Sequence, residues 1–252
     1  MRLMITALHF LTIIRLWKVG ETTGENLGRS MAWFPLVGAF IGLIAAGVAV
    51  AAQIVFSSHV AAVFVVAVLV IVTGALHQDG FADTIDGLAA GWDRERALAI
   101  MKDSAIGSYG VVGLILLITA KVMLIAEIPR GMLVGTLIAM PVAGRWSTVC
   151  LASLFPYARS GSGTAAVFVR FAGKRETAWA SVWALVLTAV ATQWGGVLSF
   201  AACIMWTFCV GTFFLRRIGG VTGDIMGAVN ETAEVLFLVG MIVIPNLSGG
   251  VL

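Results

Sequence analysis

Charged residues are scarce in this chain, and their scarcity excludes an ordinary soluble domain. Only 12% of the 252 residues are Asp, Glu, Lys or Arg, whereas 60% are hydrophobic, and the mean hydropathy is +1.02. Soluble domains carry about 25% charged residues. Several apolar runs approach the ~20 residues that cross ~30 Å of hydrocarbon as a helix. The sequence therefore predicts an all-α, polytopic membrane protein.

Cysteine is also rare, which argues against a disulfide framework. Cys150, Cys203 and Cys209 all lie in apolar runs, at spacings unlike those of metal ligands, so we expect them to serve packing. The N-terminus lacks a clear cleavage site of small residues, and we expect no removable signal peptide. A net charge of +3 is too small for a nucleic-acid-binding surface, so no nucleic-acid partner is expected.

The order of apolar runs predicts about seven membrane-spanning helices in a single domain, residues 1–252. Residues 1–20 place apolar side chains on one helical face and carry Arg15 and Lys18 near their end, as an N-terminal interfacial helix does. A polar loop is expected over Glu21–Arg29. The sixth span is expected to follow residue 196 and to end at Leu215. The other spans are expected at about 32–56, 61–76, 109–126, 132–155, 178–193 and 232–251.

The basic residues predict the orientation. With the N-terminus in the cytoplasm, thirteen of the sixteen Lys and Arg fall on the cytoplasmic side, Arg130 falls outside, and Lys121 and Arg145 lie within spans. This excess follows the positive-inside rule. It places the three polar segments at the cytoplasmic face, where they can meet soluble phosphorylated substrates. These expected active-site segments are about 77–107, 156–177 and 216–231.

Carboxylates gather in the segment HQDGFADTIDGL, residues 77–88. Asp79, Asp83 and Asp86 stand at i, i+4 and i+7, within roughly 60° of arc on a helix. Because like charges at this spacing repel, and more so near a membrane, a cation is expected to compensate them. Carboxylate oxygens suit Mg²⁺, which often shares its coordination with substrate phosphates. The stripe predicts a Mg²⁺–diphosphate site; the alternative is a solvated loop between two spans.

A second polar constellation, GGVTGDIMGAVNETAE, covers residues 219–234. Asp224 and Glu231 share one helical face, and Glu234 follows Glu231 by three positions. The glycines allow close approach of backbone or phosphate, and acidic residues entering a membrane helix are candidates for function. Two acidic helices that face each other are expected to hold one or two Mg²⁺ ions. The alternative is a helix cap with interfacial charges.

Three isolated polar residues complete the candidates. Arg145 lies within an apolar span and needs an anionic partner, either a carboxylate or a substrate phosphate. Lys121 is nearer the outer end of its helix, and we expect it to snorkel to the interface. His77 directly precedes the acidic stripe, where it either hydrogen-bonds a carboxylate or substrate or serves only the helix end.

These segments, together with RERALAIMKDSAIGSYG at 94–110, resemble the signature segments of the cobalamin synthase family. Its members are also called adenosylcobinamide-GDP ribazoletransferases or cobalamin-5′-phosphate synthases. SMAWFPLVGAFIGL, at 30–43, is similar to the family's first span. IIRLWKVG departs from the family, which commonly has a proline shortly after an arginine there. The resemblance covers most of the chain, and it supports weaker inferences about residues 1–25 than about the acidic segments.

The resemblance implies a Mg²⁺-dependent enzyme of the bacterial cytoplasmic (inner) membrane, with its active site facing the cytoplasm. The ribose 3′-hydroxyl of α-ribazole, or of its 5′-phosphate, attacks the cobinamide-linked phosphate of adenosylcobinamide-GDP, and GMP leaves. Other late cobalamin enzymes are implied as partners at the same membrane. The sequence leaves open the oligomeric state, a homo-oligomer included, and which ribazole is used.

The candidate residues divide by role. Lys102 is the first candidate for binding a phosphate oxygen. Asp103 or Asp224 is expected to complete the set of metal ligands or to act as the base. The expected metal ligands are Asp79, Asp83, Asp86 and Asp224. The expected catalytic residues are Asp83, Asp103, Lys102 and His77. The expected substrate-binding residues are Arg94, Arg145, Ser104 and Glu231.

Three other functions compete with this interpretation. A membrane prenyltransferase also holds Mg²⁺–diphosphate on aspartate stripes. A CDP-alcohol phosphotransferase usually has Ala-Arg after Asp-Gly, whereas Phe-Ala-Asp follows Asp79-Gly80 here. A cation or corrinoid transporter would use its intramembrane carboxylates to bind cargo, and such proteins often contain internal repeats. Only a weak echo links 79–86 with 224–231.

Overall fold

The computed structural model describes residues 2–15, 22–161 and 163–247, and within these ranges no β-strand forms. The helices, in chain order, are α1 (Arg2–Leu11), α2 (Gly24–Arg29), α3 (Phe34–Ala52), α4 (Ser58–Thr73), α5 (Leu76–Ala89), α6 (Arg94–Ile100), α7 (Ser108–Glu127), α8 (Arg130–Leu154), α9 (Thr164–Phe171), α10 (Lys174–Ile218) and α11 (Gly223–Leu247). A short 3-10 helix, η1 (Ser30–Trp33), joins α2 to α3. The prediction of an all-α protein is confirmed.

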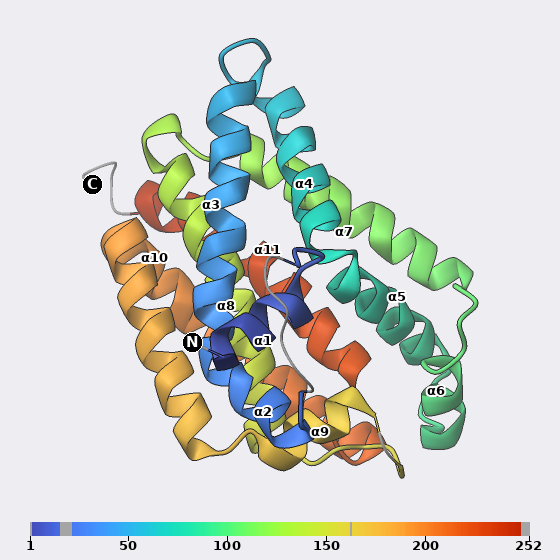
Figure 1. Ribbon diagram of the computed structural model, residues 1–252. Coiled ribbons are helices and arrows are strands. Elements are labelled where there is room, and N and C mark those ends of the chain that lie inside the picture. Colours follow the sequence, from blue (N-terminus) through green and yellow to red (C-terminus); the bar gives the residue numbers. More distant parts are fainter. Residues whose placement is uncertain (1, 16–21, 162, 248–252) are drawn as a thin grey trace.

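Helix α8 forms the core of the bundle (Figure 1). Every residue from 139 to 152 is buried, and α8 packs against α3, α10 and α11. The contact with α3 depends on two glycines, Gly38 and Gly42. A Cβ atom on Gly42 would lie 2.4 Å from the carbonyl oxygen of Leu137. This carbonyl has no helical N–H partner, because Pro141 stands four residues later. Small residues thus let the two backbones approach, as in other membrane bundles.

Five of the described helices are long and apolar enough to cross a membrane. Helices α4 and α5 meet that requirement only as a pair, bent by 92°. At the bend, Gly74 and Ala75 both adopt left-handed backbone angles, with φ of 61° and 57°. The bend ends the apolar helix α4 and starts the acidic helix α5 in a new direction (Figure 1). The protein is therefore a polytopic membrane protein, as predicted.

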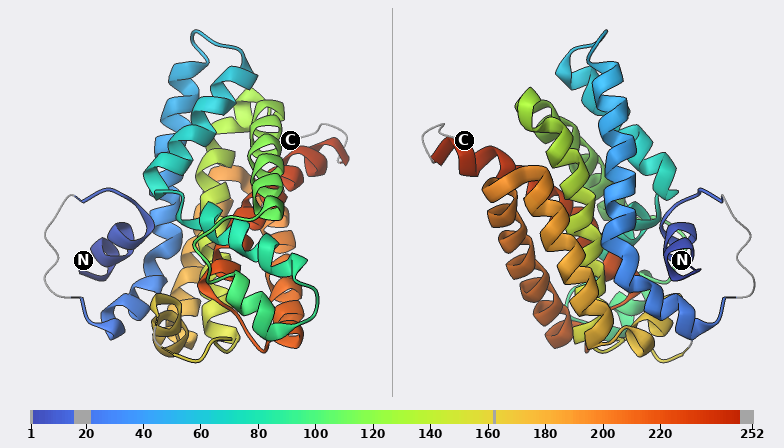
Figure 2. Two further views of the ribbon diagram at one scale, coloured as in Figure 1. Left: turned by 90° about the vertical axis from the view of Figure 1, so that its right-hand side faces the viewer. Right: turned by 60° about the vertical axis from the view of Figure 1, so that its left-hand side comes forward.

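Helix α10 is divided into two arms at Gln193, whose φ of 54° and ψ of −147° are not helical. Trp146 of α8 contacts both arms, by a 2.8 Å hydrogen bond to Ser181 and by its ring against Phe200. Figure 2 shows the arms side by side. The break adjoins the predicted turn at 194–196. Counting both arms, and α4–α5 as one span, gives the seven predicted crossings; their number and direction stay predictions.

Three local predictions need correction. The last span was expected at about Thr232, but α11 begins at Gly223, because Thr222 caps it by accepting a hydrogen bond from the Ile225 amide. The polar loop expected over Glu21–Arg29 is helical from Gly24 onward, although Glu21 itself lies outside the described residues. The polar stretch after α8 also contains a helix, α9.

Candidate active site

The two acidic segments of the sequence meet where α5 crosses α11. A Cβ atom on Gly80 would lie 2.9 Å from both Cα and O of Asp224, and one on Gly227 would lie 3.1 Å from the carbonyl oxygen of His77. Only glycine allows this contact at position 80, since real Cβ atoms do not approach backbone so closely. The glycines within the acidic motifs therefore determine how closely the carboxylates of α5 and α11 approach each other.

Asp79, Asp83 and Asp224 form an acidic group at this crossing. The charges of Asp79, Asp224 and Asp86 disfavour a negative charge on Asp83, as burial also does, and the charge of Arg159 favours it. Arg159 Nη2 lies 2.7 Å from Oδ2 of Asp224, and among the described residues Arg159 Nε is buried without a hydrogen-bond partner. One cation does not balance three carboxylates, so the group retains negative charge for a further cation.

A cavity of about 210 Å³ opens beside this group. Asp79 and Asp224 line it, together with His77, which is only 4% exposed. Helices α1 and α9 contribute the rings of Phe10 and Phe168 to its wall. The predicted candidates His77, Asp79 and Asp224 are therefore brought together around one space.

Asp86, the third member of the predicted stripe, has other partners. Its Oδ2 accepts a 2.7 Å hydrogen bond from the Gly107 amide, and its Oδ1 accepts a 2.8 Å bond from the Gly110 amide. These amides begin α7, so the carboxylate caps that helix at its positive end. A Cβ atom on Gly110 would lie 2.4 Å from Oδ2. Both carboxylate oxygens are thus engaged by backbone, and a metal-binding role for Asp86 competes with this cap.

Arg94 ties the polar segments together. Its Nε donates to the Ile218 carbonyl at 2.7 Å, and its Nη2 donates to the Ala158 carbonyl at 3.0 Å. The guanidinium is therefore occupied by the backbone of the other two polar segments. Its expected role in phosphate binding stays a prediction.

The remaining predicted residues of this region lie in the exposed loop between α6 and α7. Lys102, Asp103 and Ser104 are all exposed, and Asp103 accepts a 3.0 Å hydrogen bond from the Ala105 amide. The loop ends at Gly107, where Asp86 holds it one helical turn from Asp83. The loop therefore ends beside the acidic face of α5.

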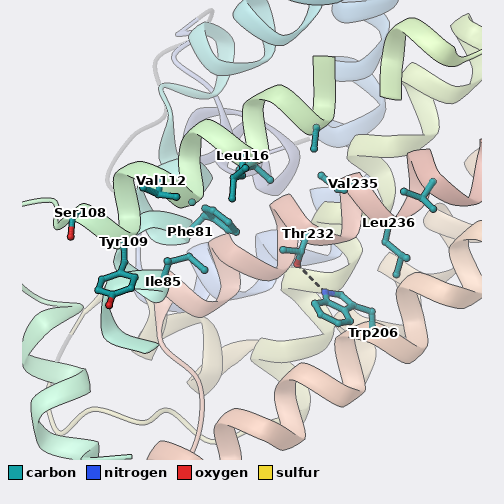
Figure 3. A pocket seen from close by; sticks show the side chains of 14 residues that line it. Phe81, Ile85, Ser108, Tyr109, Val112, Leu116, Trp206, Thr232, Val235 and Leu236 are labelled. Carbon is teal, nitrogen blue, oxygen red and sulfur yellow. Dashed lines mark hydrogen bonds between the residues drawn. The ribbon is translucent and has the colours of Figure 1, made fainter. Parts of the chain in front are cut away.

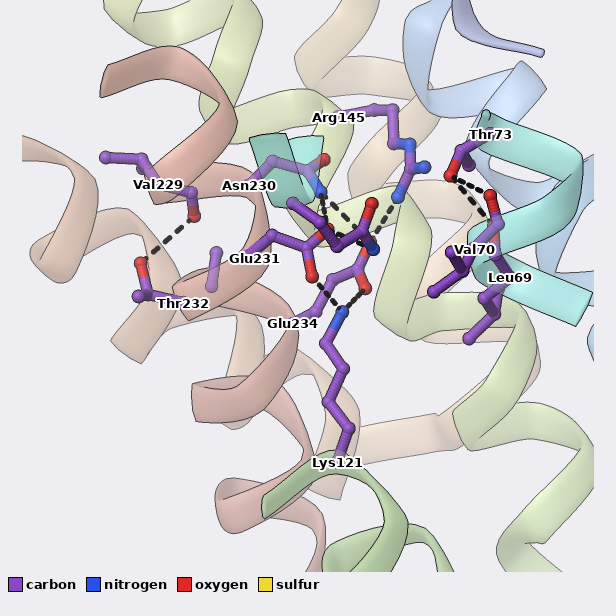
Figure 4. Close-up of polar contacts among 12 residues, drawn as sticks. Leu69, Val70, Thr73, Lys121, Arg145, Val229, Asn230, Glu231, Thr232 and Glu234 are labelled. Carbon is purple, nitrogen blue, oxygen red and sulfur yellow. Dashed lines mark hydrogen bonds and ion pairs between the residues drawn. The ribbon is translucent and has the colours of Figure 1, made fainter. Parts of the chain in front are cut away.

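A charge network lies inside the bundle (Figure 4). Lys121 Nζ is 2.6 Å from Oε2 of Glu231 and 2.6 Å from Oε2 of Glu234, and Arg145 pairs with Glu234. All four side chains are nearly fully buried. The predicted anionic partner of Arg145 is thus a carboxylate. The expectation that Lys121 snorkels is wrong, because α7 directs it toward α11.

Two amides complete this network, and both were missed by the sequence analysis. Gln78 Nε2 donates to Glu231 at 3.2 Å, and Asn230 donates to both Glu231 and Glu234. Two cations face two carboxylates, so the network is neutral and joins α5, α7, α8 and α11. The sequence did contain a signal for the network itself: Lys121 lies within an apolar helix, where a lysine is costly without an anionic partner. Arg159 carried no such signal, since it stands in a polar loop.

The larger cavity, of about 740 Å³, lies on the other side of α5 (Figure 3). Phe81 and Ile85 line it from α5, and Tyr109, Trp206 and Val235 line it from α7, α10 and α11. Its one internal polar contact shown in the figure joins Trp206 Nε1 to Thr232 Oγ1 at 2.9 Å. Its wall is almost wholly apolar and contains no carboxylate, whereas Asp79 and Asp224 line the smaller cavity.

The acidic group fits a Mg²⁺ ion that is shared with a ligand. Among the described residues, no three His, Cys, Asp or Glu side chains come close enough to hold a metal by themselves. Mg²⁺, however, commonly takes one or two carboxylates and completes its octahedron with water and phosphate oxygens. Asp79, Asp83 and Asp224 supply oxygen donors of that kind and an uncompensated negative charge.

Comparisons with known proteins agree with this picture. The family model described as cobalamin-5-phosphate synthase matches residues 3–242. An adenosylcobinamide-GDP ribazoletransferase of Geotalea daltonii is 38% identical over 97% of this chain and 98% of its own length. Proteins of the same name from Chlorobium phaeobacteroides and Clostridium acetobutylicum are 36% and 33% identical, each over 94% of this chain and 95% and 94% of their own lengths. No solved structure matches the chain.

Proposed function

Because the chain belongs to the cobalamin-5-phosphate synthase family, we propose that it joins adenosylcobinamide-GDP to α-ribazole or its 5′-phosphate. The products are adenosylcobalamin or its 5′-phosphate, and GMP. The observation that carries the assignment of the site is the crossing of α5 and α11, which gathers Asp79, Asp83 and Asp224 beside a cavity. A diphosphate-bearing substrate needs such a group of carboxylates when Mg²⁺ accompanies it.

The reaction is a phosphoryl transfer with simple bond changes. The 3′-hydroxyl oxygen of the ribazole forms a bond to the cobinamide-linked phosphorus, and the phosphoanhydride bond to GMP breaks. We assign Asp83 as the group that accepts the hydroxyl proton, since it is half-buried and feels the charges of Asp79 and Asp224. GMP carries away the electron pair of the broken bond as phosphate charge.

Asp79 and Asp224, which line the cavity, would hold Mg²⁺. When bound, the ion neutralises charge that develops on the bridging and non-bridging oxygens. Arg159 stands beside Asp224, and its Nε has no partner in the part of the chain that the structure describes, so it can donate to a phosphate oxygen as the substrate arrives. Lys102, on the exposed loop, adds a second cation for the guanylate phosphate.

The network around Lys121 serves a different purpose. Arg145 and Glu231 already have charged partners of opposite sign within the bundle. We assign both to positioning α5 against α7, α8 and α11, and not to direct contact with substrate. The protein acts from the bacterial inner membrane with its acidic face toward the cytoplasm, where other late cobalamin enzymes supply and consume its reactants.

Release of GMP by the purified, lipid-reconstituted protein tests this function. Given adenosylcobinamide-GDP, α-ribazole 5′-phosphate and Mg²⁺, we expect GMP together with an equal amount of the joined corrinoid. Corrinoid uptake into vesicles without GMP would identify a transporter instead. Turnover that requires a polyprenyl diphosphate would identify a prenyltransferase.

A further inference from the structure

The 210 Å³ cavity has two chemically different sides. Helices α5 and α11 contribute His77, Asp79 and Asp224, and Thr148 of α8 and Thr164 of α9 add two hydroxyl groups. Helices α1 and α9 contribute the rings of Phe10 and Phe168, which contact each other edge to face with centroids 4.8 Å apart. A ligand that fills the cavity therefore presents an apolar, aromatic part to α1 and α9 and a polar edge to α5.

His77 gives the cavity a specific hydrogen-bonding group. Its side chain is buried, and among the described residues Nδ1 has no hydrogen-bond partner. Buried polar atoms in folded proteins are nearly always satisfied, so an unpaired nitrogen on a residue that lines a cavity points to a ligand atom. A neutral imidazole offers one N–H donor and one acceptor nitrogen.

We propose that this cavity binds the benzimidazole base of α-ribazole, with Nδ1–H of His77 donating to the unsubstituted ring nitrogen of the base. The proposal rests on the function proposed above. The dimethylated benzene ring then packs against Phe10 and Phe168. The ribose, attached to the other ring nitrogen, emerges on the polar side, where Asp79 and Asp224 line the cavity.

Size and polarity favour this base over the other parts of the two substrates. Cavities for drug-sized ligands measure roughly 300–1,000 Å³, so 210 Å³ accommodates a two-ring heterocycle and excludes a corrin. Guanine carries several donors and acceptors on its edge, each of which needs a partner when buried. A benzimidazole riboside has a single free ring nitrogen, which can pair with Nδ1 of His77, a buried atom that has no partner among the described residues.

The interaction is tested by removing each partner in turn. Equilibrium binding of α-ribazole is measured by benzimidazole fluorescence, without the second substrate, in parallel with an indole riboside in which CH replaces the free nitrogen. Wild-type protein should prefer α-ribazole about tenfold, the usual size of one hydrogen bond. His77→Phe should bind both ribosides equally, while the control His59→Phe, at an exposed site on α4, should keep the preference. An undiminished preference in His77→Phe overturns the proposal.

A second variant keeps the test decisive if His77→Phe does not fold. Ala165→Leu, on α9, fills the cavity from its wall. We expect the Kd for α-ribazole to rise at least tenfold and the Kd for adenosylcobinamide-GDP to stay unchanged. The reverse pattern would assign the cavity to guanine and overturn the proposal.

The outcomes also separate this proposal from the proposed function. Discrimination between the ribosides without any GMP release would contradict the function and leave the base pocket standing. GMP release without discrimination in the wild-type protein would contradict only the pocket.

Discussion

Gly80 and Asp224 meet backbone to backbone, at a distance that leaves no room for a side chain on residue 80. A Cβ atom there would stand 2.9 Å from the Asp224 Cα atom. This contact joins the first acidic motif of the sequence to the last one. The acidic face exists because α5 and α11 approach this closely, so its geometry depends on a residue that carries no chemistry.

Gly80→Ala should therefore separate the two acidic helices. Overpacking of this kind costs about 1–3 kcal/mol, and a shift of about 1 Å at a reacting centre can cost 10²-fold in rate. We expect GMP release to fall about 100-fold while the protein still inserts and folds. The matched control is Gly47→Ala on α3, where an added Cβ atom meets nothing within 4 Å. Turnover of Gly80→Ala within twofold of the control would contradict the role of this contact.

Asp86→Asn distinguishes a helix cap from a metal ligand. An asparagine replaces one of the two acceptor oxygens with an NH₂ donor, which then faces either the Gly107 amide or the Gly110 amide and leaves that amide without an acceptor. Leaving a buried N–H unsatisfied costs about 1–3 kcal/mol. We expect a lower melting temperature and an unchanged Mg²⁺ concentration for half-maximal turnover. A tenfold rise in that concentration at an unchanged melting temperature would instead make Asp86 a ligand.

Lys121→Met should destabilise the bundle strongly. It leaves Glu231 and Glu234 buried with Arg145 as their remaining basic partner among the pairs described. Breaking a buried ion pair in this way costs about 3–5 kcal/mol. Thermal unfolding in detergent is the measurement, and the double variant Lys121→Met/Glu231→Gln, which restores charge balance, should recover most of the loss.

An exposed pair provides the control for this experiment. Arg29 and Glu25 lie 2.8 Å apart on α2, and each side chain is about half exposed. Exposed pairs contribute about 0–1 kcal/mol, so Arg29→Gln should melt within a degree or two of wild type. If Lys121→Met also melted within a degree or two of wild type, the buried network would contribute no more to stability than this surface pair.

The sequence predicted the parts of this fold that depend on local pattern. Apolar length indicated the spans, and the i, i+4, i+7 spacing indicated a helix over the acidic stripe, where α5 forms. The family resemblance carried by the acidic motifs is confirmed. These features follow from hydrophobicity and helix periodicity, which a single chain displays without reference to its neighbours.

Features that depend on contacts between helices were not predictable in this way. Periodicity places Asp86 in line with Asp79 and Asp83, but it does not reveal that the start of α7 lies against Asp86. Lys121 was expected to reach the interface because it lies toward the end of its helix. That expectation was wrong because the direction in which a side chain points depends on how its helix packs against the others. The polar residues at the start of α11 were expected to precede the last span, whereas they belong to the same helix and form buried contacts inside the bundle.

The most direct test of the account is a Mg²⁺ titration of GMP release by reconstituted wild type and Asp83→Asn, with Glu95→Gln, on the exposed side of α6, as control. Wild type and Glu95→Gln should require Mg²⁺ and lose turnover in excess chelator. Asp83→Asn should release GMP at least 100-fold more slowly at every Mg²⁺ concentration, with an unchanged melting temperature. Near-normal turnover in Asp83→Asn would contradict its role as the base, and full wild-type turnover in chelator would contradict a Mg²⁺–diphosphate site on the crossing of α5 and α11.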